Sequence, residues 1–277
     1  MNPSLRRMTV VAREEYHRAL ESRWLFGFSG LLAALVLGLS FFGLAQAREV
    51  GYQGFARVTL SLMNLVLFMV PLSGLLLGVT SLTGGQATLP LLLAQPVTRG
   101  EVFLGKFLCL VAAMTIAQAV GFGAGGLVVV LNAGTEQLVG FVALTVLSFL
   151  LGAITVAGSM FLAVLWPDRL RATSAALGAW LLLVVAYDLG VLGVSSWLRG
   201  LPLQSVLLPA LLANPVDLVR VLTTVAAGSG ALFGPTSAVL VRFFGTTGGV
   251  QLALAVLLVQ LASPLVLGAW IFRRRDW

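Results

Sequence analysis

Long apolar runs separated by short polar stretches dominate this chain. Six of the runs are long enough to cross a bilayer, because a transmembrane helix needs roughly 20 residues at about 1.5 Å per residue. Lipid offers the backbone no hydrogen-bonding partner, and runs of this length fit helices rather than barrel strands. The pattern predicts an all-α membrane protein with a single membrane domain over residues 1–277, whose spans lie near 24–45, 58–82, 102–131, 138–166, 173–197 and 248–272.

The residues before the first span show a different periodicity. Four apolar residues recur near one helical face among five arginines. This spacing predicts an amphipathic helix over residues 1–23 that lies in the membrane interface. The alternative is a solvated basic tail. The first apolar run is too long for the core of a signal peptide, so we expect an uncleaved first span.

The stretch 198–247 breaks the pattern of short loops. Four prolines and several glycines interrupt a moderately apolar sequence, which argues against a clean crossing. Asn214 followed by Pro215 is typical of an N-cap and a first helical position. Asp217 and Arg220 are three residues apart and could pair on one face of that helix. We predict short re-entrant or surface helices on the outer face, with a seventh span as the alternative.

The basic residues predict the orientation. Six spans place both termini on one side, where twelve Lys and Arg residues lie against five on the other. The positive-inside rule therefore places both termini and the loop 83–101 in the cytoplasm. The twelve are Arg6, Arg7, Arg13, Arg18, Arg23, Arg99, Lys106, Arg169, Arg171, Arg273, Arg274 and Arg275, and the five are Arg48, Arg57, Arg199, Arg220 and Arg242.

Composition excludes several classes of function. The chain is 59% hydrophobic and 10% charged, with a mean hydropathy of +1.02, which lies outside the soluble range. Its net charge is +7, but no soluble segment combines a basic stripe with aromatics, so we expect no nucleic-acid partner. The single cysteine, Cys109, excludes an intramolecular disulfide. No residue pattern predicts a metal site, a bound cofactor or a catalytic set. The methionines within the spans are better explained by packing than by a Cu(I) relay.

Polar side chains within the predicted spans are candidates for function. Asp188 lies near the outer end of the fifth span, where a functional role and simple contact with headgroup water are equally compatible. Asn64, Gln118 and Gln251 are weaker candidates, because hydrogen bonds between helices explain them. The G-x-x-x-G pairs at 74–78 and 121–125 predict close helix approach within or between subunits.

One nucleotide-binding pattern proves misleading. Residues 100–106 read G-x-x-x-x-G-K, but Phe107 stands where a phosphate-binding loop needs Ser or Thr, and no strand precedes the pattern. We interpret Lys106 as the headgroup anchor at the start of the third span.

The loop that precedes the third span carries a family resemblance. From Thr88 to Lys106 it resembles the first cytoplasmic loop of ABC-2 type transporter permeases, whose usual pattern is G-T-L-E-L-L-L-x-x-P-V-S-R-x-E-I-L-L-G-K. The charged run that usually precedes this pattern is absent from residues 83–87, and Pro90 stands in place of the usual Glu. The resemblance implies a coupling helix seated in a cleft of a cytosolic ATPase. The expected contact residues are Thr88, Leu89, Leu91, Leu92, Gln95, Pro96 and Arg99.

Within this family, three segments resemble the permeases of nitrous oxide reductase maturation systems: the opening Met-Asn-Pro, residues 51–67 and residues 212–222. That resemblance implies a homodimer in the bacterial inner membrane, driven by two cytosolic ATPases that bind ATP and Mg²⁺. It also implies a periplasmic β-helical copper-handling protein, docked near Asn214, Asp217 and Arg220. The alternative is an exporter of a small or amphipathic solute, with Asn64, Gln118 and Asp188 along its path.

Overall fold

The computed structural model describes residues 27–38, 52–84, 98–132, 135–190, 193, 203–228 and 243–274, which are helical apart from short turns and contain no strand. The labelled elements are α3 (Tyr52–Thr83), α5 (Arg99–Asn132), α6 (Thr135–Leu165), α7 (Arg169–Leu181), the π-helix η1 (Leu182–Ala186), α9 (Leu203–Ala213), α10 (Pro215–Ala226) and α12 (Thr247–Arg274).

Five stretches of helix are long and apolar enough to cross a membrane: Ser61–Thr83, Arg99–Gly123, Val139–Leu165, Arg169–Gly190 and Thr247–Arg274. They confirm the all-α membrane class. The predicted first span, 24–45, is described only at the apolar helix Gly27–Gly38. The predicted interfacial helix 1–23 and residues 85–97 of the predicted coupling loop lie outside the described residues.

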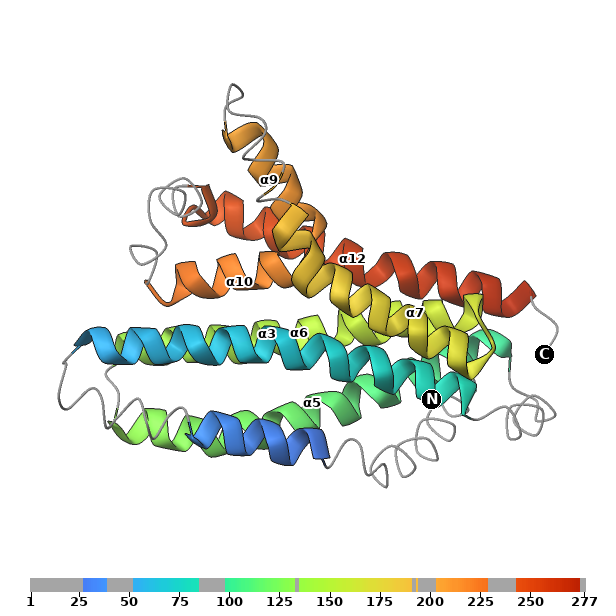
Figure 1. The fold of residues 1–277 in the computed structure, drawn as a ribbon, viewed down its shortest axis with the longest axis horizontal. Coiled ribbons are helices and arrows are strands. Elements are labelled where there is room, and N and C mark those ends of the chain that lie inside the picture. The colour runs from blue at the N-terminus through green and yellow to red at the C-terminus, as the bar shows by residue number, and fades with distance from the viewer. Residues whose placement is uncertain are drawn as a thin grey trace, which may run out of the picture.

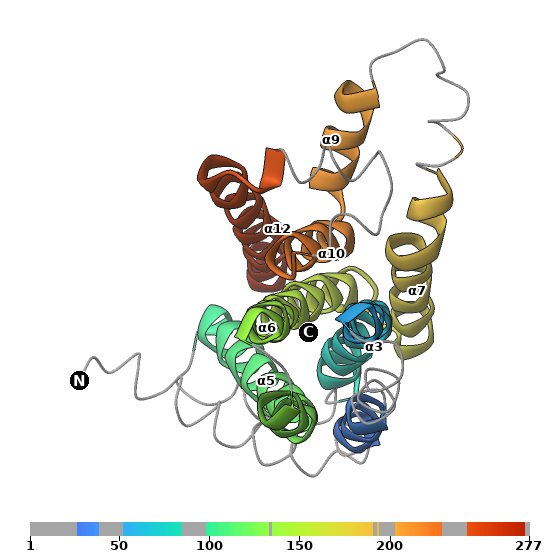
Figure 2. The same cartoon turned by 90° about the vertical axis from the view of Figure 1, so that its left-hand side faces the viewer.

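Helix α6 is the centre of the bundle. It contacts α3, α5, α7, α10 and α12, and it lies between α3 and α5 on one side and α10 and α12 on the other (Figure 2). Its closest neighbour is α3, because Gly74 and Gly78 bring the α3 backbone against Thr155 and Ser159. The Ser159 hydroxyl donates to the Gly74 carbonyl at 3.2 Å. The predicted glycine pair at 74–78 therefore serves packing within one chain.

One end of the long helices is rich in arginine. At one end, on the right in Figure 1, α3 ends, α5 begins, α6 ends, α7 begins and α12 ends. We call this the basic end, because Arg99, Arg169, Arg171, Arg273 and Arg274 all lie in the terminal turns that meet there. The opposite end is called the far end.

Helix α7 begins earlier than its apolar run. The prediction placed the fifth span at 173–197, whereas the helix starts at Arg169. Asp168 explains the difference, because its carboxylate accepts the Arg171 backbone N–H at 3.2 Å and caps the helix. Within the candidate spans, the side chains of α7 and α12 are mostly exposed in the isolated chain, whereas more than half of those in the apolar stretches of α3, α5 and α6 are buried.

The stretch predicted to hold short helices contains two of them. Helix α9 leans away from the bundle, and α10 returns along α6 toward the far end (Figures 1 and 2). The two helices, 11 and 12 residues long, meet at Asn214. Neither is long enough to be a span, so residues 203–228 do not form the alternative seventh crossing. We refer to α9, Asn214 and α10 as the hairpin.

Candidate functional site

Of the predicted coupling loop 83–101, the structure describes residues 83–84 and 98–101, and the second of these stretches begins α5. Thr98 and Glu101 form a capping box: the Glu101 carboxylate accepts the Thr98 N–H at 2.9 Å, and the Thr98 hydroxyl accepts the Glu101 N–H at 3.4 Å. The box starts the helix at Arg99, three residues before the predicted start at 102. The loop therefore runs directly into a capped helix. Of its predicted contacts, Arg99 is described, and Thr88, Leu89, Leu91, Leu92, Gln95 and Pro96 lie outside the described residues.

The first turn of α5 packs against the last turns of α12. The Arg99 guanidinium donates to the Arg273 carbonyl at 3.5 Å. A Cβ on Gly100 would lie 2.6 Å from Nη2 of Arg273, so glycine lets the guanidinium cross the α5 backbone. Below it, the Phe103 and Phe272 rings are 5.5 Å apart, both fully buried, and Gly268 makes room for Phe103. We call this contact the α5–α12 junction.

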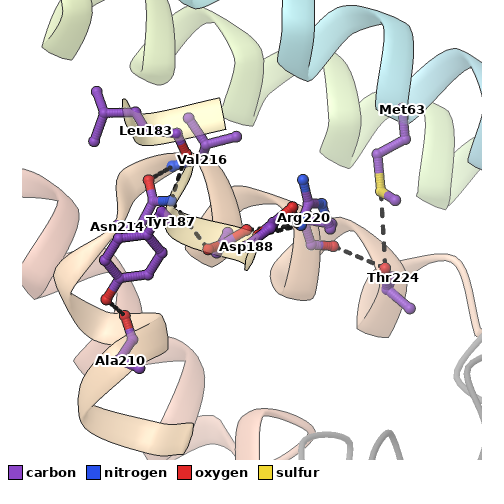
Figure 3. Close-up of polar contacts among 10 residues, drawn as sticks. Met63, Leu183, Tyr187, Asp188, Ala210, Asn214, Val216, Arg220 and Thr224 are labelled. Carbon is purple, nitrogen blue, oxygen red and sulfur yellow. Dashed lines mark hydrogen bonds and ion pairs between the residues drawn. The ribbon is translucent and has the colours of Figure 1, made fainter. Parts of the chain in front are cut away.

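A second group of polar residues joins the hairpin to the end of α7. Asn214 is the N-cap of α10, since its Oδ1 accepts the Val216 N–H at 3.1 Å and Pro215 opens the helix, which confirms the predicted N-cap. Its Nδ2 donates to the Leu183 carbonyl in η1 at 2.7 Å and to Asp217 at 3.0 Å (Figure 3). One amide thus caps α10 and bridges it to η1.

Arg220 joins two carboxylates. Its Nη1 donates to Asp217 at 2.7 Å on the same helix, which confirms the predicted pair. The same nitrogen donates to Asp188 at 3.0 Å, in the turn of helix that follows η1 (Figure 3). The Asp217 side chain is only 6% exposed, against 38% for Asp188. The inner carboxylate therefore depends on Arg220 far more than the outer one does.

The pKa of the Asp217 carboxyl reflects this burial. Asp217 lies in α10, outside the candidate spans. Burial raises its pKa from 3.8 to about 7, and Asp188 acts in the same direction, while Arg220 and the Asn214 hydrogen bond lower it. The group consequently takes up a proton far more readily than an exposed aspartate.

Two further side chains hold the carbonyls beside the break in the hairpin. The Tyr187 hydroxyl donates to the Ala210 carbonyl at 2.5 Å, and Gln260 of α12 donates to the Leu212 carbonyl at 2.9 Å. Carbonyls at the end of a helix lack partners within it, and in lipid they need partners from neighbouring helices. We call Tyr187, Asp188, Asn214, Asp217 and Arg220 the hairpin cluster.

Sequence reasoning missed Tyr187, Gln260 and the π-helical turn. Nothing in the spacing of Leu182–Ala186 distinguishes a π-turn from an α-helix. Tyr187 had one available signal, since it directly precedes Asp188 in an apolar run. Gln260 had a similar one, as an amide in the middle of the last span.

Comparison with known proteins decides the family. The sequence model of the family described as ABC-2 family transporter protein matches residues 9–277. The chain belongs to this family. It is also 32% identical to the probable ABC transporter permease protein NosY of Pseudomonas aeruginosa, over 96% of this chain and 98% of that protein. The protein of the same name from Stutzerimonas stutzeri is 32% identical over 96% of this chain and 97% of its own length. This chain is a multi-pass membrane permease.

The three residues predicted to line a solute path lie in three different environments. Asn64 is exposed on α3. Gln118 is fully buried on α5, facing α6. Asp188 is paired with Arg220 in the turn of helix that follows η1. No contact among the described residues brings the three side chains together.

The predicted outer contacts lie within the protomer. Asn214 and Asp217 are buried, with 0% and 4% of their surface exposed, and Arg220 is partly buried. An outer partner could touch Asn214 or Asp217 directly only if α10 moved.

The described residues hold no group of three His, Cys, Asp or Glu side chains that could bind a metal ion. Met114 and Met160 are buried in the core, and the Met63 sulfur accepts the Thr224 hydroxyl at 3.8 Å. These three methionines pack within the bundle.

Proposed function

We propose that this permease is the membrane subunit of an ABC transporter in which a separate pair of cytosolic ATPases supplies the driving force. ATP and Mg²⁺ bind to the ATPases, and this chain binds no cofactor of its own. The loop 83–101 is the coupling helix, with ATPase contacts at Thr88, Leu89, Leu91, Leu92, Gln95, Pro96 and Arg99. The match of Thr88–Lys106 to the family pattern, within a chain that belongs to the family, supports this assignment.

The basic end faces the cytoplasm in this proposal. The charge asymmetry of the loops supports it, and the coupling loop then joins α3 to α5 on the ATPase side. Residues 24–45 complete a set of six spans, residues 1–23 lie in the interface, and the hairpin is a re-entrant element on the outer side. Both termini are cytoplasmic, and the membrane is the bacterial inner membrane.

Through the α5–α12 junction, a movement of the coupling loop displaces two helices. A rigid shift of Arg99 and Gly100 displaces α5 directly. It also displaces α12, because Arg273 and Phe272 pack on the same turn of α5. Close-packed helices move as units rather than deform, so a displacement at the junction reaches the far end of both helices.

The proposed role is maturation of nitrous oxide reductase, through a homodimer that acts on a periplasmic β-helical copper-handling partner. Two observations support it: the two relatives named NosY, and the segments at 51–67 and 212–222. The exposed apolar faces of α7 and α12 are available to lipid or to a second copy. ATP-driven change reaches the partner only if the partner binds two states of the dimer with different affinity. In this scheme the hairpin cluster sets the position of α10 and thereby the surface that the partner meets.

The family pattern at Thr88–Lys106 is the observation that carries the proposal, and Leu92→Asp tests it. A charge in the apolar contact should abolish co-purification of the ATPase and permease-dependent maturation, while the spans still insert. The matched control is Leu170→Asp in the first turn of α7, which is 75% exposed at the basic end and remote from the loop in sequence. Normal maturation and normal ATPase pull-down in the Leu92→Asp protein would reject the assignment.

The alternative function, export of a small or amphipathic solute, predicts a different set of partners. Co-purification from native membranes with mass spectrometry distinguishes the two. Recovery of an ATPase together with a periplasmic β-helical protein supports the proposal, and recovery of an ATPase alone favours the exporter.

A further inference from the structure

Gln118 is a buried amide without a protein partner. It lies on α5 with no exposed surface, and neither Oε1 nor Nε2 has a hydrogen-bonding partner among the described residues. The side chain points at Gly152 of α6, where a Cβ would lie 2.6 Å from Nε2. Met114, one turn earlier on α5, has its Cγ 3.4 Å from the same point. Glycine at 152 therefore leaves room for the amide.

The amide is too deep in the bundle to reach bulk water. Gly152 is 13 residues from either end of the candidate span Val139–Leu165. That separation is about 20 Å at 1.5 Å per residue, which exceeds the length of a glutamine side chain. An amide left unpaired in an apolar medium costs about 2–7 kcal/mol, and buried amides in native proteins almost always have a partner.

Buried hydroxyl groups recur along α6 near this contact, at Ser148, Thr155 and Ser159. The Thr155 and Ser159 hydroxyls lie against Gly74 and Gly78 of α3. The Ser148 and Thr155 hydroxyls donate to carbonyls of their own helix at 2.8 Å and 3.0 Å. The Ser159 hydroxyl is shared between the Val156 carbonyl of α6 at 2.8 Å and the Gly74 carbonyl of α3 at 3.2 Å. Their protons are used, but their oxygens can still accept. Ser148 and Thr155 flank Gly152 by one turn on either side.

We propose that Gln118 binds a buried water molecule at the contact between α5 and α6. The amide offers the water both a donor and an acceptor, and the hydroxyl oxygens of Ser148 and Thr155, each one turn from Gly152, are the candidate further acceptors. The contact between α5 and α6 then holds one water at the level of Gly152. Gln118 holds a structural water in this arrangement rather than lining a solute path. The inference is independent of the function proposed above.

X-ray radiolysis of the full-length permease in lipid nanodiscs tests the water directly. A short X-ray pulse makes hydroxyl radicals from bound water as well as from bulk water, and these oxidise only the nearest side chains. Met114 is 1% exposed, and Met160 on α6 is 0% exposed. If water is bound at Gln118, Met114 should be oxidised severalfold faster than Met160, as measured by mass spectrometry. Equal rates for the two methionines would overturn the proposal.

Gln118→Leu supplies the second measurement. The substitution removes the amide, so Met114 oxidation should fall toward the Met160 rate and the thermal midpoint should fall, because the water loses its main partner. If the site is dry, the same substitution removes an unpaired amide and leaves the midpoint unchanged or raised. Gln251→Leu, at an exposed position on α12, is the matched control. A midpoint for Gln118→Leu at or above that of the control, with Met114 oxidation unchanged, rejects the water site.

Discussion

The α5–α12 junction and the hairpin cluster hold two pairs of helices together by opposite means. At the junction, Phe103, Phe272 and two glycines pack apolar surface closely, with a guanidinium laid over the backbone. In the hairpin cluster, Arg220, Asn214 and their partners use directional hydrogen bonds, and one carboxylate is almost fully buried. The filling of apolar volume stabilises the junction, whereas the pairing of charged groups stabilises the hairpin cluster. Substitutions should therefore fail differently in the two, and pH should affect only the second.

The largest effect is expected from Phe272→Ala in the junction. The ring is fully buried against Phe103, so its loss leaves a cavity and should destabilise the permease by about 3–5 kcal/mol. Equilibrium unfolding in mixed micelles measures the change, which should not depend on pH. Leu267→Ala, at a half-exposed position on the same helix, is the control and should have a small effect. Equal effects of the two would show that the junction is not close-packed in the membrane.

The next effect is expected from Arg220→Met, which leaves the Asp217 carboxylate buried and unpaired. Removing one partner of a buried pair costs about 3 kcal/mol or more. The exposed pair Arg171–Asp168, with side chains 78% and 58% exposed, is the control, and Arg171→Met should change stability by less than about 1 kcal/mol.

The pH dependence of Arg220→Met separates the two regions. The folded-state pKa of Asp217 is raised to about 7 from 3.8, so between these values the folded state binds the proton more tightly than the unfolded state does. The contribution of Asp217 to stability therefore falls as pH rises through this window. Without Arg220 the charged form loses its main partner, so the destabilisation should be smaller near pH 6 than near pH 8. A pH-independent loss would show that Asp217 does not carry the effect.

A smaller effect separates the two roles of Asn214. Asn214→Ser retains a side-chain oxygen for the Val216 N–H and removes the amide that reaches the Leu183 carbonyl, whereas Asn214→Ala removes both. Losing the cap costs about 1 kcal/mol, and losing a buried amide bridge costs a similar amount. Serine should therefore fall between alanine and the native protein in unfolding measurements. If serine matches the native protein, the bridge to η1 contributes nothing to stability.

The smallest change in stability is expected from Gly100→Ala in the junction. The added methyl meets the flexible end of Arg273, which can move aside, and alanine favours the helix by up to about 1 kcal/mol. The two contributions should nearly cancel, whereas Gly123→Ala on the same helix meets nothing within 4 Å and should stabilise. If Gly100→Ala stabilises as much as Gly123→Ala, Arg273 does not lie over α5.

Much of this fold could be predicted from the sequence because lipid imposes simple constraints. Apolar runs fixed the all-α class and the approximate positions of five spans, because every backbone polar group in lipid must be paired within its own helix. The Asn214–Pro215 cap and the Asp217–Arg220 pair followed from spacings within one helix, and both are present. The start of α7 was misplaced by four residues, because Asp168 extends the helix beyond its apolar run.

Other features of the site depend on contacts between distant segments. The pairing of Arg220 with Asp188 and the bridge from Asn214 to Leu183 each join residues more than 30 positions apart. The packing of Arg273 over Gly100 joins the start of α5 to the end of α12. No local spacing encodes these contacts.

The sequence by itself determined that this chain is a helical membrane permease of the ABC-2 family, because hydropathy and a loop motif are local properties. The tertiary structure alone decided which polar groups meet. It buried Asn214 and Asp217 beneath the surface on which the sequence had placed an outer partner, and it left the Gln118 amide facing a glycine. The physical reason is that a buried polar group is defined by its partners, and only the packed bundle determines which partners lie within reach.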